Sequence, residues 1–325
     1  MTQIDRVLRS NLKLRHLQML VALDQFRHIG RAAEFLSVTQ PAVSKTLAEI
    51  ERMFGLALFE RSTRGTEPTP YGDSVVRFAR SVLADYDRTR DELAAVASGA
   101  AGRTSLGSMV VALPVLVAPA VEMLKLRSAL TTVLVEEGDL TRLLPKLRLG
   151  ELDVFVGRLE PGYAAPDLDT EALYTDTMAA VVQPGHALAA KRKLRWADLA
   201  TSPCVMPPPW ASLRVKLDRM FLLDDLHPPS DIVESASFLA QLSFMQQRGA
   251  VAFMARSVAR HFERQGLLKI LSIAVPIELP AVGLISMRGR RRTPSTEQLV
   301  DCLRAVGKAL AGGRAGGLRR KAAFG

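Results

Sequence analysis

Short β-rich runs alternate with helical runs over most of the chain, from residue 109 to residue 311. Apolar β-rich residues occupy 109–112, 132–135, 152–156, 178–182, 204–206, 251–254 and 282–286, and helical periodicity fills 117–128, 139–149, 212–223, 237–247 and 295–311. Alternation of this kind is typical of βαβ units, in which parallel strands are covered by helices. The sequence therefore predicts an α/β fold for this region.

These units fall into two sets. The first covers 106–173 and the second 174–269, and the strand and helix of 281–312 are needed to complete the first set. Two α/β lobes joined by crossover segments leave a cleft between them, which is where a small ligand usually binds in such a layout. We therefore expect one domain over 106–312, with lobe I formed by 106–173 and 281–312 and lobe II by 174–269.

A long helix is predicted ahead of this domain. Residues 73–97 contain no Gly or Pro and place apolar side chains at spacings of three and four, which describes one apolar stripe. The small-residue stretch 97–107 that follows is typical of a flexible linker. The segment 73–105 is therefore expected to be a linker helix with a hinge.

The segment 30–51 predicts two short helices separated by a tight turn. Ala32, Ala33 and Leu36 give the first helix a small apolar face, and the pattern breaks after Leu36. Thr39 can cap the second helix and Pro41 fits its first turn, where a missing N–H costs nothing. Two helices joined in this way form a helix-turn-helix, which we place in a domain over residues 12–72.

The polar face of the second helix suits a DNA major groove. Gln can pair with adenine, Ser and Thr reach bases or phosphates, and Lys reaches guanine or the backbone. After this helix, 56–72 resembles a two-stranded wing with a turn at Gly65, whose Arg61 and Arg64 can enter a minor groove or bind phosphate. The alternative is an ordinary helical hairpin with a solvated polar face. The candidate DNA-binding residues are Arg31, Thr39, Gln40, Pro41, Ser44, Lys45, Thr46, Arg61 and Arg64.

The net charge of +10 is unevenly distributed and by itself says little about DNA. Residues 288–325 carry ten basic and two acidic side chains, whereas 1–72 carry ten and seven and 73–287 are close to neutral. The Gly- and Ala-rich tail 313–325 is expected to be disordered and basic. It can touch DNA phosphates non-specifically, but a solvated end without function is the simpler interpretation.

Several motifs together resemble the LysR-type transcriptional regulators. They are Leu14-Arg-His-Leu17, Arg31-Ala-Ala33, Leu36-Ser-Val-Thr-Gln-Pro-Ala-Val-Ser-Lys45, Leu58-Phe-Glu-Arg61 and Thr69-Pro-Tyr-Gly72, in that order. The resemblance implies DNA contacts at Gln40, Pro41, Ser44, Lys45 and Arg61, and a dimer built through the linker helix that pairs into a tetramer. Features such as Arg288-Gly-Arg-Arg-Arg-Thr-Pro294 resemble the branch holding regulators of a galactose-binding protein and of the protocatechuate pathway.

The resemblance also implies an effector domain similar to a periplasmic binding protein, with a small-molecule inducer between its lobes. By position, the pocket residues are Leu113, Pro114, Gly157, Arg158, Pro207, Trp210, Ser235, Ser237, Phe253 and Met254. Because the loop 111–116 is apolar, Arg158 is the cation expected to bind an acid group on the inducer, and a sugar is the other candidate ligand. The alternative for Arg158 is a surface salt bridge at the lobe edge.

Other protein classes are poorly supported. The five histidines and two cysteines form no metal-binding motif, and no nucleotide-binding or nucleophile-elbow motif occurs, so we expect neither a cofactor nor an enzyme. Without a signal peptide or an apolar run of about 20 residues, a soluble cytoplasmic protein is expected. Two rival interpretations stay open: a solute-binding module that uses the helix-turn-helix only for assembly, and a constitutive DNA binder with a closed cleft.

Overall fold

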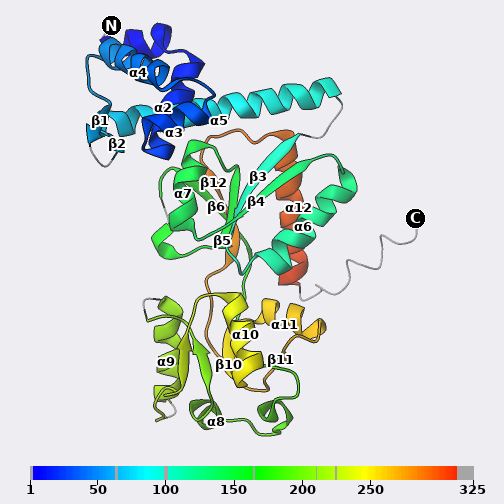
Figure 1. Ribbon diagram of the computed structural model, residues 1–325. Helices are drawn as coiled ribbons and strands as arrows, with labels where there is room; N and C mark the ends of the chain where they lie inside the picture. Colours follow the sequence, from blue (N-terminus) through cyan, green and yellow to red (C-terminus); the bar gives the residue numbers. More distant parts are fainter. Residues whose placement is uncertain are drawn as a thin grey trace. The chain divides into compact units, whose positions relative to one another are not determined.

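The computed structural model of the chain describes residues 3–62, 65–98, 102–163, 165–209, 211–223 and 225–312. The chain divides into two compact units (Figure 1), one formed by Met1–Arg103 with Leu144–Leu152 and the other by Thr104–Leu143 with Asp153–Gly325. The expected basic tail 313–325 lies outside the described residues. Within the described part of the chain, none of the helices combines the length and the apolar character that a membrane span requires.

The first unit carries the expected helix-turn-helix and wing. Its elements are α1 (Gln3–Arg6), a π-helical turn (Val7–Asn11), α2 (Leu14–Phe26), α3 (Ile29–Phe35), α4 (Gln40–Phe54), β1 (Phe59–Ser62), β2 (Gly65–Pro68) and α5 (Pro70–Ser98). Strands β1 and β2 pair antiparallel, with Ser62 opposite Gly65. The wing predicted from 56–72 is therefore confirmed.

Capping side chains set where the two helices of the motif begin. The imidazole of His28 accepts hydrogen bonds from the N–H groups of Gly30 and Arg31 at the start of α3. Thr39 caps α4, because its Oγ1 accepts from the N–H of Ala42 at 3.4 Å. Helix α4 then buries its apolar face in the core of the unit through Val43, Leu47, Ile50 and Phe54. The capped helix thus has one face fixed in the core and leaves the opposite face free.

The long helix is present and starts earlier than predicted. Helix α5 begins at Pro70 and not at Asp73. Gly72 does not interrupt the helix, because the lack of a side chain there lets the first turn of α5 pack closely on the wing. The N–H of Gly72 donates to Thr69 Oγ1 at 3.1 Å, and a methyl group on Gly72 would collide with the carbonyl oxygen of Leu58. Val76 and Ala79 of α5 are buried, and Val76 packs in the core of this unit.

The second unit holds two five-stranded sheets. The sheet of lobe I has the strand order β4-β3-β5-β12-β6. Its strands are β3 (Arg103–Ser108), β4 (Thr132–Glu137), β5 (Val154–Arg158), β6 (Leu168–Tyr174) and β12 (Val282–Met287), and its helices are α6 (Ala118–Arg127), α7 (Leu140–Leu149) and α12 (Pro294–Ala311). The second half of α7, from Leu144, is grouped with the first unit. Helices α6 and α12 lie side by side next to this sheet (Figure 1). Short π and 3-10 turns, Leu113–Val117 and Pro161–Tyr163, lie between these elements.

The sheet of lobe II has the order β11-β7-β10-β8-β9. Its strands are β7 (Met178–Val182), β8 (Cys204–Met206), β9 (Ile232–Glu234), β10 (Val251–Ala255) and β11 (Lys269–Ile270). Its helices are a 3-10 turn (Ala187–Ala190), α8 (Trp196–Ala200), α9 (Ser212–Leu223), α10 (Phe238–Arg248) and α11 (Arg256–Arg264). The indole of Trp196 is buried and meets Phe221 edge-on, with 5.0 Å between the ring centroids, so it belongs to the core of lobe II.

Two expectations about the sheets are wrong. Residues 109–112 form a turn, and the first strand of lobe I is β3 at Arg103–Ser108, inside the stretch that the sequence indicated to be a linker. The sheets are also mixed, because β12 runs antiparallel to both β5 and β6. The chain returns from lobe II and enters β12 beside the last residues of β5 and β6, so β12 must run in the opposite direction to both strands. Strands β6, β9 and β11 and helix α11 were not predicted.

Candidate functional site

The first candidate site is the free face of α4. Thr39, Gln40, Pro41 and Lys45 are exposed, while Ser44 and Thr46 are half-buried. The first two turns of α4 therefore present an amide, a hydroxyl and an ammonium group on the side away from the core. A helix with this set of donors and acceptors at its N-terminal end can read base edges in a major groove.

The wing is fixed to the end of α2. The N–H of Thr66 donates to the carbonyl oxygen of Arg27 at 2.8 Å, and the guanidinium of Arg27 bridges Asp24, at 2.8 Å, and Glu67. The backbone of Arg61 lies in β1, Arg31 is exposed on α3, and Arg64 lies outside the described residues. Arg27 was not among the predicted residues, and its role is to hold the wing.

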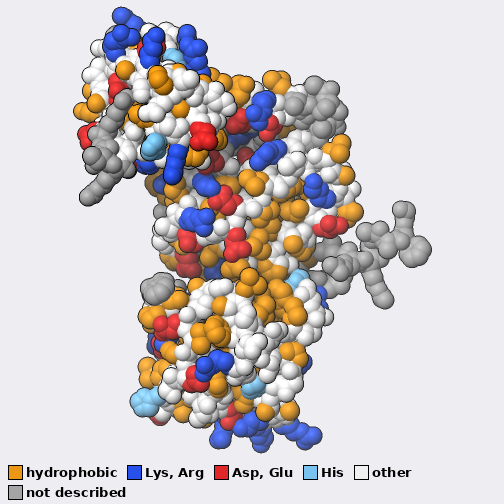
Figure 2. All heavy atoms as spheres, viewed as in Figure 1, with side chains coloured by type: hydrophobic (Ala, Val, Ile, Leu, Met, Phe, Trp, Pro, Cys, Tyr) orange, Lys and Arg blue, Asp and Glu red, His pale blue; other side chains and the backbone are white. Residues whose placement is uncertain are grey.

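The second candidate site is a cavity of about 1320 Å³ inside the second unit, where lobe I meets lobe II. Lobe I contributes Val110, Leu113 and Val117, and lobe II contributes Leu213, Phe238 and Phe253. Most of the lining side chains are apolar, and Figure 2 shows hydrophobic side chains gathered on this face where the lobes meet. The cavity therefore suits a ligand with an apolar body.

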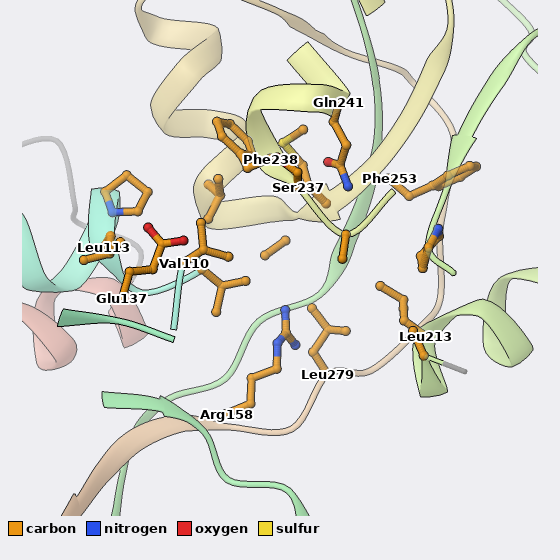
Figure 3. Close-up of a pocket in the computed structure, with 18 of the residues that line it drawn as sticks. Val110, Leu113, Glu137, Arg158, Leu213, Ser237, Phe238, Gln241, Phe253 and Leu279 are labelled. Atoms are coloured by element: carbon orange, nitrogen blue, oxygen red, sulfur yellow. The ribbon is translucent and has the colours of Figure 1, made fainter. Parts of the chain in front are cut away.

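Arg158, the last residue of β5, points its guanidinium into this cavity (Figure 3), and Ser237, Phe238 and Gln241 lie on the wall across from it. Its Nη1 is buried and has no hydrogen-bond partner among the described residues. Burial lowers the pKa of the Arg158 guanidinium below its usual value, while the charge of Asp176, then Tyr174 and Glu160, acts in the opposite sense. Because arginine stays protonated in proteins, the cavity wall carries a buried cation with an unused donor.

The other charged lining groups are mostly acidic. Glu122, Glu137 and Glu160 line the cavity, and Glu137 lies to one side of Arg158 beside Val110 and Leu113 (Figure 3). Lys216 is the second basic lining residue, and its Nζ donates to the carbonyl oxygen of Glu278 at 3.3 Å. Apart from Lys216 and a few neutral polar side chains, the wall around Arg158 is thus apolar or negative.

The structure brings most of the predicted pocket residues together. Eight of them line the cavity: Leu113, Pro114, Arg158, Pro207, Ser235, Ser237, Phe253 and Met254. Gly157 does not, because it is buried within β5, and a methyl group there would lie 2.7 Å from Sδ of Met109. Trp210 lies outside the described residues. Arg158 lines the cavity, and its buried Nη1 has no partner within the described residues, which speaks against a surface salt bridge at the lobe edge.

Sequence reasoning missed several lining residues. Glu137 is the last residue of β4, Gln241 lies in the first turns of α10, and Leu279 lies on the segment that returns to lobe I. A signal was available for Glu137, because residues at the carboxyl ends of parallel strands line the crevice of an open α/β sheet. Leu279 carries no local signal, since only the return crossover brings it to the cavity. No cluster of three potential metal ligands is present among the described residues.

Two family models match the chain. Residues 14–73 match the model described as "Bacterial regulatory helix-turn-helix protein, lysR family", and residues 97–308 match the "LysR substrate binding domain". The second match alone spans well over half of the chain. The chain belongs to the LysR family. It is accordingly a transcriptional regulator with a DNA-binding helix-turn-helix and an effector-binding domain.

Relatives within the LysR family agree with the branch that the sequence motifs indicated. The chain is 32% identical to the HTH-type transcriptional regulator GbpR of Azospirillum brasilense, covering 92% of this chain and 88% of the relative. It is 26% identical to the regulator PcaQ of Agrobacterium fabrum, covering 94% and 98%. The predicted branch is therefore confirmed.

Solved LysR-family structures share the fold. The crystal structure of CbnR superposes with a TM-score of 0.67 at 19% identity, covering 91% of this chain and all of that chain, and CbnR is also known in complex with its target DNA. A full-length OxyR variant from Pseudomonas aeruginosa, with one cysteine replaced by aspartate, gives a TM-score of 0.62 at 22% identity, covering 91% and 96%. At these identities the comparison bears on the fold alone, and it supports the predicted fold class.

Proposed function

We propose that this LysR-family regulator reads its operator through α4, assembles as a pair of dimers joined through α5, and binds an acidic inducer at Arg158. The observation that carries the proposal is the buried, unpartnered Nη1 of Arg158 in the wall of a large apolar cavity. A carboxylate is the natural partner of a guanidinium fork, because two parallel charge-assisted hydrogen bonds form at once.

The operator contacts are assigned to Gln40, Pro41, Ser44 and Lys45, with Arg31, Thr39 and Thr46 beside them. Support comes from the exposure of Gln40 and Lys45 at the start of a helix whose other face is fixed in the core. Gln40 is assigned to base recognition and Lys45 to guanine or phosphate. Arg61 and Arg64 are proposed as the wing residues that contact DNA, and this assignment rests on the sequence alone.

Assembly through α5 is supported by its apolar stripe. Phe78, Tyr86 and Leu93 are 39%, 47% and 66% exposed, although the sequence places them on one face of a long helix. An isolated domain of about 60 residues makes few phosphate contacts, so pairing two copies across two half-sites raises both affinity and specificity. The proposed dimer buries this stripe, and two dimers form the tetramer.

The experiment that tests the DNA assignment is a gel-shift titration on the upstream DNA of the gene at two salt concentrations. We expect Gln40→Ala/Ser44→Ala to lose specific binding, and we expect wild-type affinity to fall steeply with salt because phosphate contacts release counterions. The matched control is Gln18→Ala/Ser10→Ala, which removes an exposed Gln and an exposed Ser outside α4. Specific binding that survives in the α4 variant would contradict the assignment, and absence of any binding would favour the solute-binding alternative.

A further inference from the structure

The chemistry of the cavity wall limits the class of inducer more narrowly than an acid group alone. We infer that the inducer is a monocarboxylate with an apolar body, and that the site discriminates against sugars and against dicarboxylates. This inference rests on the proposed function, since it concerns the same cavity. The proposed function concerns only the acid group that binds Arg158. The inference specifies the charge and the polarity of the rest of the ligand.

The apolar body follows from the side chains around Arg158. Leu113, Val117, Leu213, Phe238 and Phe253 face the cavity from both lobes. A ligand buried here gains from removing apolar surface from water. Each hydroxyl of a bound sugar would instead need a partner, and an unsatisfied buried hydroxyl costs free energy. The wall supplies few such partners, with Ser235, Ser237 and Gln241 grouped on lobe II.

The limit to one carboxylate follows from the charges. Glu122 and Glu137 line lobe I, and Glu160 is close enough to Arg158 to favour its charged form. A second carboxylate on the ligand would approach these side chains between mostly apolar walls, where like charges repel more strongly than in water. The other lining cation, Lys216, is exposed to solvent, so water and salt screen its charge more than that of Arg158. Arg158 therefore supplies the one buried cation donor that is unpartnered within the described residues.

The fork of Arg158 sets the orientation of the ligand. The Arg158 backbone N–H donates to Sδ of Met109 at 3.3 Å, which ties the end of β5 to the turn that follows β3. The guanidinium points into the cavity, toward the lobe II wall that carries Phe238 and Gln241 (Figure 3). A carboxylate on this fork directs the rest of the ligand toward Phe238 and Leu113, so that both lobes touch it.

Two matched series of small molecules test the inference on the full chain. The first is 4-methylbenzoate, 4-methylbenzamide and terephthalate, and the second is hexanoate, hexanamide and adipate, with D-galactose added as the sugar. Affinity is measured by titration calorimetry and checked by the rise in Tm. We expect a monocarboxylate of at least one series to bind at least ~10-fold more tightly than its amide and its dicarboxylate, with no binding of galactose.

Variants separate the charge of the site from its fold. Arg158→Met keeps the apolar stem and should abolish the preference for acid over amide, while Arg158→Lys should retain part of it because one charge stays without the fork. Arg288→Met removes a surface arginine paired with Asp169 and should leave binding unchanged. Glu137→Gln should reduce the ratio of monocarboxylate affinity to dicarboxylate affinity by several-fold. A variant that is merely misfolded would not produce this outcome.

Several results would overturn the inference. They are tightest binding of a dicarboxylate or of galactose, equal binding of acid and amide, or no binding of either monocarboxylate. The gel shift on the same protein samples separates this failure from failure of the proposed function. If the protein shifts its operator but prefers galactose, only the inferred ligand class is wrong. If it prefers a monocarboxylate but does not shift DNA, the operator assignment is wrong.

Discussion

Asp176 accepts a hydrogen bond from the hydroxyl of Ser257 at 2.5 Å, and the backbone N–H of Ser257 donates to both of its carboxylate oxygens at 3.2 and 3.3 Å. Asp176 lies on the crossover from β6 to β7, and Ser257 is the second residue of α11. The carboxylate thereby satisfies N-terminal donors of α11 and opposes the positive end of that helix. The crossover between the lobes is thus fastened to lobe II.

We expect Asp176→Asn and Ser257→Ala each to lower the free energy of unfolding by about 1.5–3 kcal/mol, the range for hydrogen bonds to charged groups. Urea denaturation measures this. Asp169→Asn is the control, because Asp169 and its partner Arg288 are more than half exposed and such pairs contribute about 0–1 kcal/mol. Equal losses in Asp176→Asn and Asp169→Asn would mean that the crossover contact is not special.

Thr39 and Gln40 should separate stability from DNA binding. Removing the cap in Thr39→Ala should cost about 1 kcal/mol of stability. Exposed Gln40 makes no such cap, so Gln40→Ala should leave stability within about 0.5 kcal/mol of wild type and weaken operator binding by about 1–3 kcal/mol. Denaturation and gel shift on the two variants check this, and a Gln40→Ala variant with normal affinity would remove Gln40 from the operator contacts.

Gly72 should not tolerate a side chain. A methyl group at this position collides with the carbonyl oxygen of Leu58, which is backbone and cannot swing away. Gly72→Ala should therefore destabilise the first unit by at least about 2 kcal/mol. Gly162→Ala is the matched control, since nothing lies within 4 Å of the added methyl group. Similar denaturation midpoints for the two variants would contradict the close packing of α5 on the wing.

The two thiols should be inert in the folded chain. Cys204 and Cys302 are both buried, and burial raises the pKa of each thiol, to about 12 for Cys204. Since the thiolate is the reactive form, a disulfide reagent at pH 8 should label neither thiol in native protein and both thiols in denaturant. Rapid labelling of the native chain would instead indicate a thiol accessible to oxidants.

Stability should fall in alkali. Burial, followed by the charge of Asp176, raises the pKa of Tyr174 from 10 to about 12, and burial raises that of Cys204 from 9 to about 12. Both groups hold their proton more tightly when folded, so their stabilisation is complete below pH 9 and is lost as pH rises toward 12. Tyr174 alone corresponds to about 2–3 kcal/mol. Tyr174→Phe should flatten the decline in urea unfolding between pH 9 and 11, and an unchanged slope would refute this.

Much of the fold could be predicted because its signals are local. Met178–Val182, Cys204–Met206 and Ser212–Leu223 form elements with the predicted bounds, since each is a continuous apolar run or a periodic one. The strand Arg103–Ser108 lacks that signal because Thr104 and Ser108 are buried polar residues. Thr104 is satisfied by a hydrogen bond to Thr296, 192 residues away. No local sequence pattern can predict a hydrogen-bond partner that far away in the sequence.

The cavity shows the same limit. Arg158 and Gly157 were predicted together, yet Gly157 is buried in β5 against the side chains of Phe155 and Met109, so only Arg158 lines the cavity. Glu137 and Leu279, which set its charge and its apolar wall, depend on where lobe I and lobe II meet. The sequence therefore predicted the cation of Arg158, whereas the acidic side chains near it could be found only from the fold.

The return of β12 to lobe I also determines the order in which the chain can be completed on the ribosome. The helix-turn-helix, the wing and the part of α5 that packs on them all lie before residue 99, so they can fold while most of the chain is unmade. The sheet of lobe I has β12 between β5 and β6, so it stays split until Val282–Met287 has emerged. A nascent regulator therefore has its DNA-binding module before it can sense an inducer, and a transcript truncated before that strand would encode a DNA binder without a working sensor.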